Sequence, residues 1–232
     1  ISIVFQGAMN AWNPVAKIGE QIREAIREHR PNNTKAENIK KIEELFSIVG
    51  LDNSVMDRYP HELSGGMKQR AVIALALSCD PKIVIADEPT TALDVVIQDQ
   101  ILKELKKVQD LLGLSLIYIS HDIAVIAEMT DNMAVMYAGS IVELGPTVEV
   151  FGNPKHAYTR LLLESTPSVV GPKKKLRSLD GEPPSLINEI SGCSFSPRCP
   201  EPTKDCKEQN LEMKLIEINK GHFADQCCAK CG

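Results

Sequence analysis

The stretch that decides the fold is Leu63–Arg70, which reads LSGGMKQR, and it is followed closely by IVIADE at Ile83–Glu88. The two glycines of the first stretch let backbone N–H groups gather around an anion at a helix start, and its serine adds a hydroxyl donor. The second stretch is an apolar strand that ends in two carboxylates, Asp87 and Glu88. Buried charge of this kind is costly unless a metal ion or a reaction uses it. Together the two stretches predict phosphate chemistry.

Helical and strand periodicities alternate along the chain. Asn13-Pro14 supplies an N-cap and a proline at the first helical position, so we expect a helix from there that stops before Pro31. A capping box at Thr34–Glu37 opens a second helix, which Gly50 closes. Further helices are expected over about 67–78, 95–112 and 153–164, and strands over 1–6, 83–87, 115–119, 133–137 and 140–144. This alternation predicts an α/β fold with a mostly parallel, helix-covered sheet and a helical insert.

Length, charge and hydropathy bound the class of protein. A chain of 232 residues can build one sizeable core and a smaller appendage. The formal net charge of -5 argues against nucleic acid as the main partner. No apolar run approaches the roughly 18–20 residues that span a bilayer. Residues Ile1–Gln6 resemble a strand already under way and there is no initiator Met, so we expect that the beginning of the protein is missing from this sequence.

The seven cysteines divide into two groups. Cys79 stands alone in an apolar helix and is expected to be a small core residue. The other six lie between Cys193 and Cys231, and such a cluster in a cytosolic-looking α/β chain indicates a metal site more than disulfides. Composition also shifts there: we expect a linker over 166–191 and a cysteine-rich extension over 192–232 that needs a metal to fold.

Five motifs, in order, resemble those of the ATP-binding cassette ATPases. They are the signature loop at Leu63–Arg70, the Walker B end at Asp87-Glu88, the D-loop at Ala92–Asp94, the switch histidine His121 and the Q-loop glutamine Gln6. The resemblance covers about residues 1–163. It implies a P-loop NTPase-like domain over 1–165, with a helical subdomain over about 14–80.

The resemblance implies roles for four residues in ATP hydrolysis. Asp87 would support Mg²⁺, and Glu88 would act as the catalytic base. His121 would contact the γ-phosphate, although a histidine at a strand end can also be a structural residue satisfied by the backbone. Gln6 would contact Mg²⁺ and the attacking water, and would link ATP to a transmembrane partner.

The same resemblance implies a dimer of ATPase subunits. Ser64, Gly65 and Gly66 would grip the γ-phosphate of ATP held by the opposite subunit, and Asp94 would couple the two sites. The helical subdomain and the Q-loop would receive the coupling helix of a membrane permease. These features imply a peripheral protein at the cytoplasmic face of a prokaryotic cell membrane.

One departure from the family concerns the phosphate-binding loop. The sequence contains no Gly-x-x-x-x-Gly-Lys-Ser/Thr, the loop that cradles the β- and γ-phosphates. The family places this loop before the Q-loop, and the sequence begins just upstream of Gln6. We therefore expect an N-terminally truncated ATPase whose fragment is inactive alone.

The stretch Gly192–Cys199 (GCSFSPRC) resembles the carboxyl-terminal extension of oligopeptide and dipeptide importer ATPases. In that family the extension holds a [4Fe–4S] cluster. The resemblance implies four ligands: Cys193, Cys199, Cys206 and Cys227. Alternatives for the fourth are Cys228 and Cys231. Zinc is the alternative ion because four thiolates suit either, and the wide spacings favour iron–sulfur; reduced free thiols are the remaining interpretation.

These resemblances predict the ATP-binding and ATP-hydrolysing subunit of an importer for di- and oligopeptides. Its partners would be permease subunits, a second ATPase subunit and, indirectly, an extracytoplasmic substrate-binding protein, with no nucleic acid. One alternative is an importer ATPase for nickel or other small solutes. Two others are a cassette ATPase that acts outside transport and a non-hydrolytic metal-binding interaction module.

Overall fold

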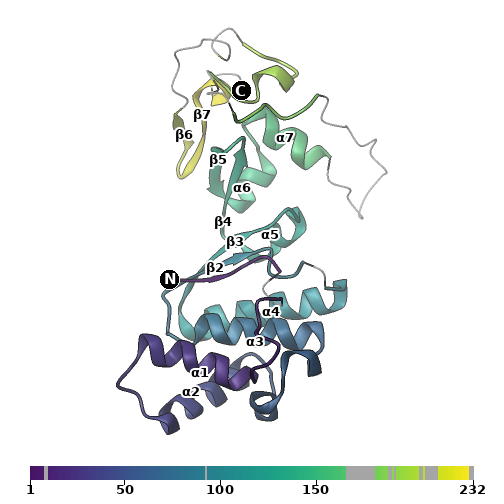
Figure 1. The fold of residues 1–232 in the computed structure, drawn as a ribbon. Coiled ribbons are helices and arrows are strands. Elements are labelled where there is room, and N and C mark those ends of the chain that lie inside the picture. The colour runs from purple at the N-terminus through teal and green to yellow at the C-terminus, as the bar shows by residue number, and fades with distance from the viewer. Residues whose placement is uncertain are drawn as a thin grey trace. The chain divides into compact units, whose positions relative to one another are not determined.

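The computed structural model describes residues 1–7, 10–91, 93–165, 181–187, 190, 192–203, 206 and 214–229. The chain forms two compact units, Ile1–His121 and Asp122–Gly232 (Figure 1). The division expected at 165/166 and 191/192 stays a prediction, and most of the expected linker lies outside the described residues. None of the described helices combines the length and the apolar character needed to cross a membrane.

The first unit contains a parallel sheet in the order β1-β2-β3. Its strands are β1 (Ser2–Val4), β2 (Ile83–Asp87) and β3 (Ser115–Ile119). Helices α3 (Gly65–Leu77) and α4 (Val95–Leu112) run beside the sheet (Figure 1). The core between them includes Val4, Val84, Ile101 and Leu105, all at most 3% exposed. The expected parallel sheet and the bounds of α4 are therefore confirmed, including the left-handed Gly113 that ends the helix.

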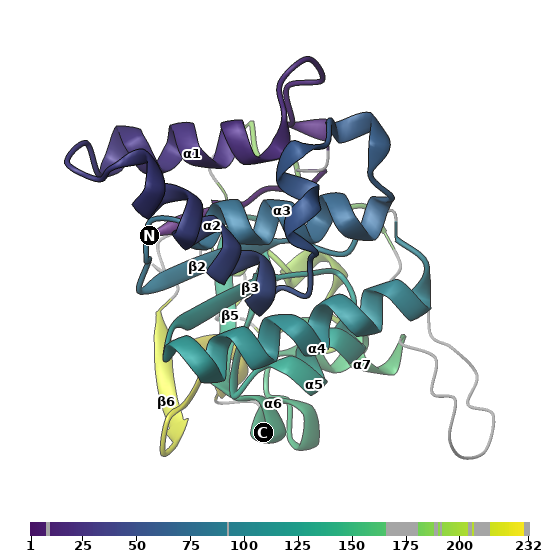
Figure 2. The ribbon, with the colours of Figure 1, turned by 90° about the horizontal axis from the view of Figure 1, so that it is seen from below.

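Helices α1 (Ile18–His29) and α2 (Lys35–Ile48) form the expected helical insert and lie side by side (Figure 2). The predicted capping box of α2 is present: Thr34 Oγ1 accepts from Glu37 N at 3.2 Å, and Glu37 Oε2 accepts from Thr34 N at 2.6 Å. The predicted start of α1 is wrong. Asn13 Oδ1 accepts from Val15 N at 3.1 Å, so Asn13 makes a local turn and the helix begins four residues after Pro14.

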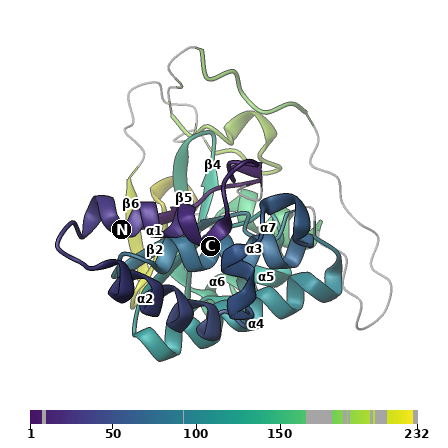
Figure 3. The same cartoon turned by 60° about the horizontal axis from the view of Figure 1, so that its bottom comes forward.

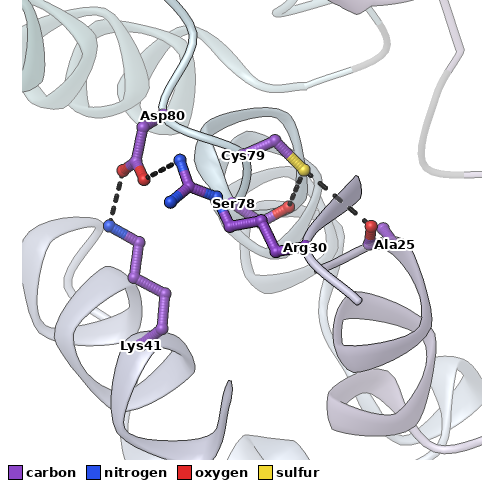
Figure 4. A network of polar contacts seen from close by, with 6 residues as sticks. All are labelled: Ala25, Arg30, Lys41, Ser78, Cys79 and Asp80. Atoms are coloured by element: carbon purple, nitrogen blue, oxygen red, sulfur yellow. Dashed lines mark hydrogen bonds and ion pairs between the residues drawn. The ribbon is translucent and has the colours of Figure 1, made fainter. Parts of the chain in front are cut away.

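A polar network joins this insert to the end of α3 (Figure 4). Asp80, at φ 49°, forms ion pairs with Arg30 Nη2 at 2.8 Å and Lys41 Nζ at 2.6 Å. Next to it, Cys79 Sγ lies 3.9 Å from the Ala25 carbonyl oxygen and is partly exposed. The expectation that Cys79 is a core residue is therefore wrong, because it lies where α3 meets the insert.

Two short 3₁₀ helices, η2 (Asn53–Asp57) and η3 (Pro60–Glu62), connect α2 to α3. The chain approaches α1 closely here, because a Cβ added at Gly19 would lie 2.9 Å from Met56 Cβ. A glycine at this position therefore allows the backbone of α1 to pack against η2.

The second unit contains an antiparallel sheet in the order β4-β5-β7-β6. Strands β4 and β5 lie side by side in Figure 3. Its strands are β4 (Asn132–Tyr137), β5 (Ser140–Pro146), β6 (Leu215–Asn219) and β7 (His222–Asp225). Its helices are α5 (Ile123–Met129), α6 (Thr147–Gly152), α7 (Ala157–Glu164), the 3₁₀ helix η4 (Ser196–Arg198) and α8 (Gln226–Ala229). The sequence predicted neither α6 nor the two tail strands, and it placed the start of α7 too early.

The strands β4 and β5 do not extend the parallel sheet. Ala138 and Gly139 both have positive φ, 50° and 82°, and a two-residue turn of that kind sends the chain straight back beside itself. Residues of the tail then add β7 and β6 to this hairpin. Phe195 of the tail packs its ring 5.2 Å from that of Tyr137 and 5.4 Å from that of Tyr158, so the tail shares the core of this unit.

Candidate functional site

Glu88 lies immediately after β2, at the carboxyl end of the parallel sheet. Its backbone N donates to the Ile119 carbonyl oxygen at 2.8 Å, which continues the pairing of β2 with β3 by one residue. Its φ of 44° is unusual for a residue with a side chain. Such strained conformations are concentrated at functional sites.

Three side chains from separate segments donate to the Glu88 carboxylate. Gln6 Nε2, after β1, lies 2.7 Å from Oε2. Thr91 Oγ1 lies 2.9 Å from the same oxygen, and His121 Nδ1, after β3, lies 2.8 Å from Oε1. The structure thus brings the predicted residues Gln6, Glu88 and His121 together at the sheet edge where open α/β sheets bind ligands.

These contacts keep Glu88 ionised. The pKa of Glu88 is lowered, first by the hydrogen bond from His121 and next by that from Thr91. The carboxylate is 21% exposed and His121 is 79% exposed, so solvent reaches both. The Glu88 carboxylate is therefore a proton acceptor that is fixed by hydrogen bonds and accessible to solvent. Sequence reasoning missed Thr91, although it lies in the short connector that carries Glu88 and Asp94.

Asp87, the last residue of β2, precedes Glu88 directly and is partly exposed. Its metal-supporting role stays a prediction, and carboxylate oxygens of this kind are the ligands that Mg²⁺ prefers. Asp94 lies at the other end of the connector, where its Oδ1 accepts from Ile97 N at 3.0 Å and caps α4. Ala92, part of the predicted D-loop, lies outside the described residues.

The signature stretch forms the start of α3. Ser64 is the N-cap, with Oγ accepting from Met67 N at 3.3 Å, and the helix begins at Gly65. The expected start at Met67 is thus two residues late, because the glycines themselves form the first turn. Ser64 and Gly65 are exposed, so the N-terminus of a 13-residue helix faces solvent. Within the described residues, this stretch shares no hydrogen bond with Glu88.

Arg70 lies one turn after the first turn of α3 and connects this helix to its neighbours. Its Nη1 donates to the Gly50 carbonyl oxygen at 2.9 Å, and its Nη2 lies 2.7 Å from Glu104 Oε1 on α4. Both side chains of this ion pair are less than one-fifth exposed. The pair therefore fixes the direction in which α3 presents its first turn.

The described cysteines of the tail gather in the second unit. Cys193, Cys206, Cys227 and Cys228 are buried and Cys199 is partly buried, all in one cluster with Phe195. Cys193 N donates to the Cys206 carbonyl oxygen at 3.1 Å, which holds the two segments together. None of these described cysteines forms a disulfide. Cys231 lies outside the described residues.

The sulfur atoms modify one another's acidity. A hydrogen bond with Cys227 is the main factor that lowers the pKa of Cys193 to about 5 and that of Cys228 to about 4. The same contacts raise the pKa of Cys227. Thiolates are the form that binds metals, so this donor set fits a soft metal ion or an iron–sulfur cluster.

Two residues outside the predicted ligand set lie at this cluster. A ring nitrogen of His156, Cys193 Sγ and a carboxylate oxygen of Asp225 lie within 4.8 Å of one another, and all three residues are buried. Burial raises the pKa of Asp225 to about 6. From the sequence, His156 was expected only as part of a helix over 153–164, with no role in a site.

Two family models match the chain: "ABC transporter" over residues 1–91 and "Oligopeptide/dipeptide transporter, C-terminal region" over residues 142–206. A dipeptide transport ATP-binding protein of Haemophilus influenzae is 45% identical over 222 residues, which cover 95% of this chain and 67% of that protein. The chain belongs to the ABC transporter ATP-binding proteins. Within them it is similar to dipeptide and peptide import proteins, and residues 142–206 match the oligopeptide/dipeptide C-terminal region.

Other relatives of this ABC protein agree. A putative peptide import ATP-binding protein of Brucella ovis is 46% identical over 230 residues, covering 96% of this chain and 67% of that protein. Among solved structures, CbiO1 of Clostridium perfringens, described as part of the ABC transporter complex CbiONQ, matches with a TM-score of 0.59 and 31% identity. The match covers 66% of this chain and 59% of CbiO1. The predicted family and fold class are confirmed, whereas the roles of the site residues stay predictions.

Proposed function

We propose that this ABC protein is the ATP-binding and ATP-hydrolysing subunit of an importer for di- and oligopeptides. The observation that carries the proposal is the ionised Glu88 carboxylate, which accepts hydrogen bonds from Gln6, Thr91 and His121. The similarity to dipeptide and peptide import proteins supports the substrate class. The matching C-terminal region supports the same branch of the family.

In this proposal Glu88 orients and deprotonates the water that attacks the γ-phosphate. A base for that step must be ionised and fixed in place, and the hydrogen bonds to Glu88 provide both properties. Asp87 would hold Mg²⁺, which neutralises charge on the transferred phosphoryl group. His121 donates to Glu88 through Nδ1 at 2.8 Å, so Nε2 would be the ring nitrogen that contacts a phosphate.

The signature stretch would serve a second subunit. Ser64, Gly65 and Gly66 present an exposed helix start, which suits the γ-phosphate of ATP bound across a dimer. Asp94, at the next helix start, would couple the two sites. Gln6 would report the state of the nucleotide to permease subunits, which would dock on the helical subdomain over about 14–80. Substrate would arrive from an extracytoplasmic binding protein, and the ATPase would lie peripherally on the cytoplasmic face.

We further propose that 1–165 is the ATPase domain and that 192–232 is an extension stapled by a metal centre. The ligands of a [4Fe–4S] cluster would be Cys193, Cys199, Cys206 and either Cys227 or Cys228. Zinc is the alternative occupant of the same thiolates. The centre would tie the tail to β4 and α7, and its role would be structural.

Substitution of the carboxylate tests the mechanism. In a transporter assembled from complete gene products, Glu88→Gln should reduce ATP hydrolysis at least about 100-fold while nucleotide binding persists, because only the proton acceptor is lost. Glu88→Gln with normal turnover would refute the role of base. Uptake of a labelled dipeptide, compared with uptake of nickel by the same cells, tests the substrate, and nickel uptake alone would overturn the peptide assignment.

A further inference from the structure

His156 lies at the start of α7 and is completely buried. Its Nδ1 accepts a hydrogen bond from the backbone N of Tyr158 at 3.1 Å, so the ring caps the helix. An imidazole nitrogen that accepts from an N–H carries no proton itself. The hydrogen bond made by one ring nitrogen fixes the state of the other, so the ring proton is on Nε2.

A buried carboxylate fixes the backbone that carries His156. Glu143 on β5 is 0% exposed, and its Oε1 and Oε2 accept from Lys155 N at 2.7 Å and His156 N at 2.9 Å. His222 Nε2 on β7, also fully buried, lies 2.8 Å from Glu143 Oε1. A buried polar network therefore holds the backbone of His156 in place.

The protonated Nε2 of His156 faces the cysteine cluster. It has no hydrogen-bond partner of standard geometry among the described residues, and Asp225 Oδ2 is 3.9 Å away, too far for a hydrogen bond. A ring nitrogen of His156 and Cys193 Sγ lie within 4.8 Å of one another, and both residues are buried. An N–H that is completely buried without a partner is costly, and this sulfur is the acceptor at hand.

We propose that, once the metal centre is loaded, His156 donates an N–H···S hydrogen bond to the metal-binding sulfur of Cys193, and is not itself a metal ligand. A ligand role would need the lone pair of Nε2, which would move the proton to Nδ1 and set it against the N–H of Tyr158. The inference rests on the metal centre in the proposed function. Hydrogen bonds to ligand sulfurs withdraw charge from them, which sets the reduction potential of a cluster and the reactivity of a thiolate.

Two substitutions separate the cap from the sulfur contact. His156→Asn keeps an oxygen where Nδ1 accepts from Tyr158 but is too short to reach the sulfur of Cys193. His156→Gln places an amide N–H at the reach of Nε2 and weakens the cap. His222→Gln is the structural control, because it perturbs the same buried network without facing the cluster.

The full-length protein is loaded anaerobically with ferrous iron and sulfide, and its midpoint potential and iron X-ray absorption are measured. We expect a sulfur-only first shell in the parent. In His156→Asn at equal cluster content, the potential should fall by the equivalent of a roughly tenfold change in equilibrium constant, about 59 mV for one electron. His156→Gln and His222→Gln should retain the parent potential. A nitrogen ligand that disappears in His156→Asn, or an unchanged potential in that variant, would overturn the proposal.

If the parent assembles no cluster, the iron–sulfur assignment fails and zinc-loaded protein tests His156 separately. Alkylation of the zinc-bound Cys193 thiolate should then be roughly tenfold faster in His156→Asn, since the hydrogen bond restrains its nucleophilicity. An equal rate, or a nitrogen in the zinc shell, would refute the proposal. If His156→Asn does not fold, ¹⁵N NMR of His156 in the parent protein tests the proposal instead. A proton on Nδ1 of His156 would contradict the proposal.

Discussion

Replacing Glu143 by leucine should destabilise the second unit without touching the nucleotide residues. The carboxylate is completely buried and accepts from two backbone N–H groups and from His222 Nε2, at 2.7, 2.9 and 2.8 Å. Each donor left unpaired costs about 1–3 kcal/mol. The apolar side chain recovers part of this by removing the cost of burying a carboxylate. We therefore expect a net loss of about 3 kcal/mol.

Hydrogen exchange at the amides of Lys155 and His156 measures this loss locally, which matters because a chain with two units need not unfold in one step. A loss of about 3 kcal/mol corresponds to roughly 100-fold faster exchange at these amides. The metal content is held equal in all samples, because bound metal stabilises the folded state by itself.

Two further variants check the reasoning. Glu143→Gln retains one acceptor oxygen and should lose about 1 kcal/mol. In Glu143→Leu combined with His222→Phe, the orphaned imidazole is gone, so about 1 kcal/mol should be recovered. Unchanged exchange in Glu143→Leu, or no recovery in the double variant, would refute the view that this network fixes the start of α7.

Three other predictions concern the first unit. Thr91→Val should reduce ATP turnover of the assembled transporter roughly fivefold, because Glu88 loses a hydrogen bond of 2.9 Å, whereas Thr91→Ser should retain it. Equal turnover in both variants would exclude a role for the hydroxyl. Thr34→Ala should lower the stability of the helical insert by about 1 kcal/mol in thermal unfolding, and Thr34→Ser should not, since only alanine removes the cap. Gly19→Ala should cost about 1–3 kcal/mol, because its Cβ would lie 2.9 Å from Met56 Cβ; parental stability would show that α1 can move aside.

Features that depend on neighbours in sequence were predictable. The capping box at Thr34–Glu37, the span of α4 and its end at Gly113 all follow from short-range rules for helix ends, and the structure has all three. Asn13 is the counter-example. Its side chain can cap a helix or close a turn with equally local hydrogen bonds, and the side chain of Gln21, which binds the Asn13 backbone, selects the turn.

The antiparallel sheet was not predictable in full because its partners are distant in sequence. β5 pairs with β7 across residues that include the linker region, and no periodicity records such a pairing. The hairpin of β4 and β5 had a local signal in Ala138-Gly139. The tail hairpin of β6 and β7 had a comparable signal in Lys220-Gly221, where Gly221 has a φ of 75°. Its pairing with β5 had none, since that pairing depends on a sheet edge supplied by the rest of the unit.

By itself, the sequence determined the family, the order of its motifs and which residues carry charge, sulfur or a phosphate-binding backbone. The tertiary structure alone decided which of them meet. Gln6, Thr91 and His121 converge on Glu88 because parallel strands bring their carboxyl ends to one edge. His156 meets Cys193 because a buried carboxylate on β5 holds the start of α7 against the cysteine cluster. Such meetings depend on packing between distant segments, and the spacing of residues along the chain does not encode them.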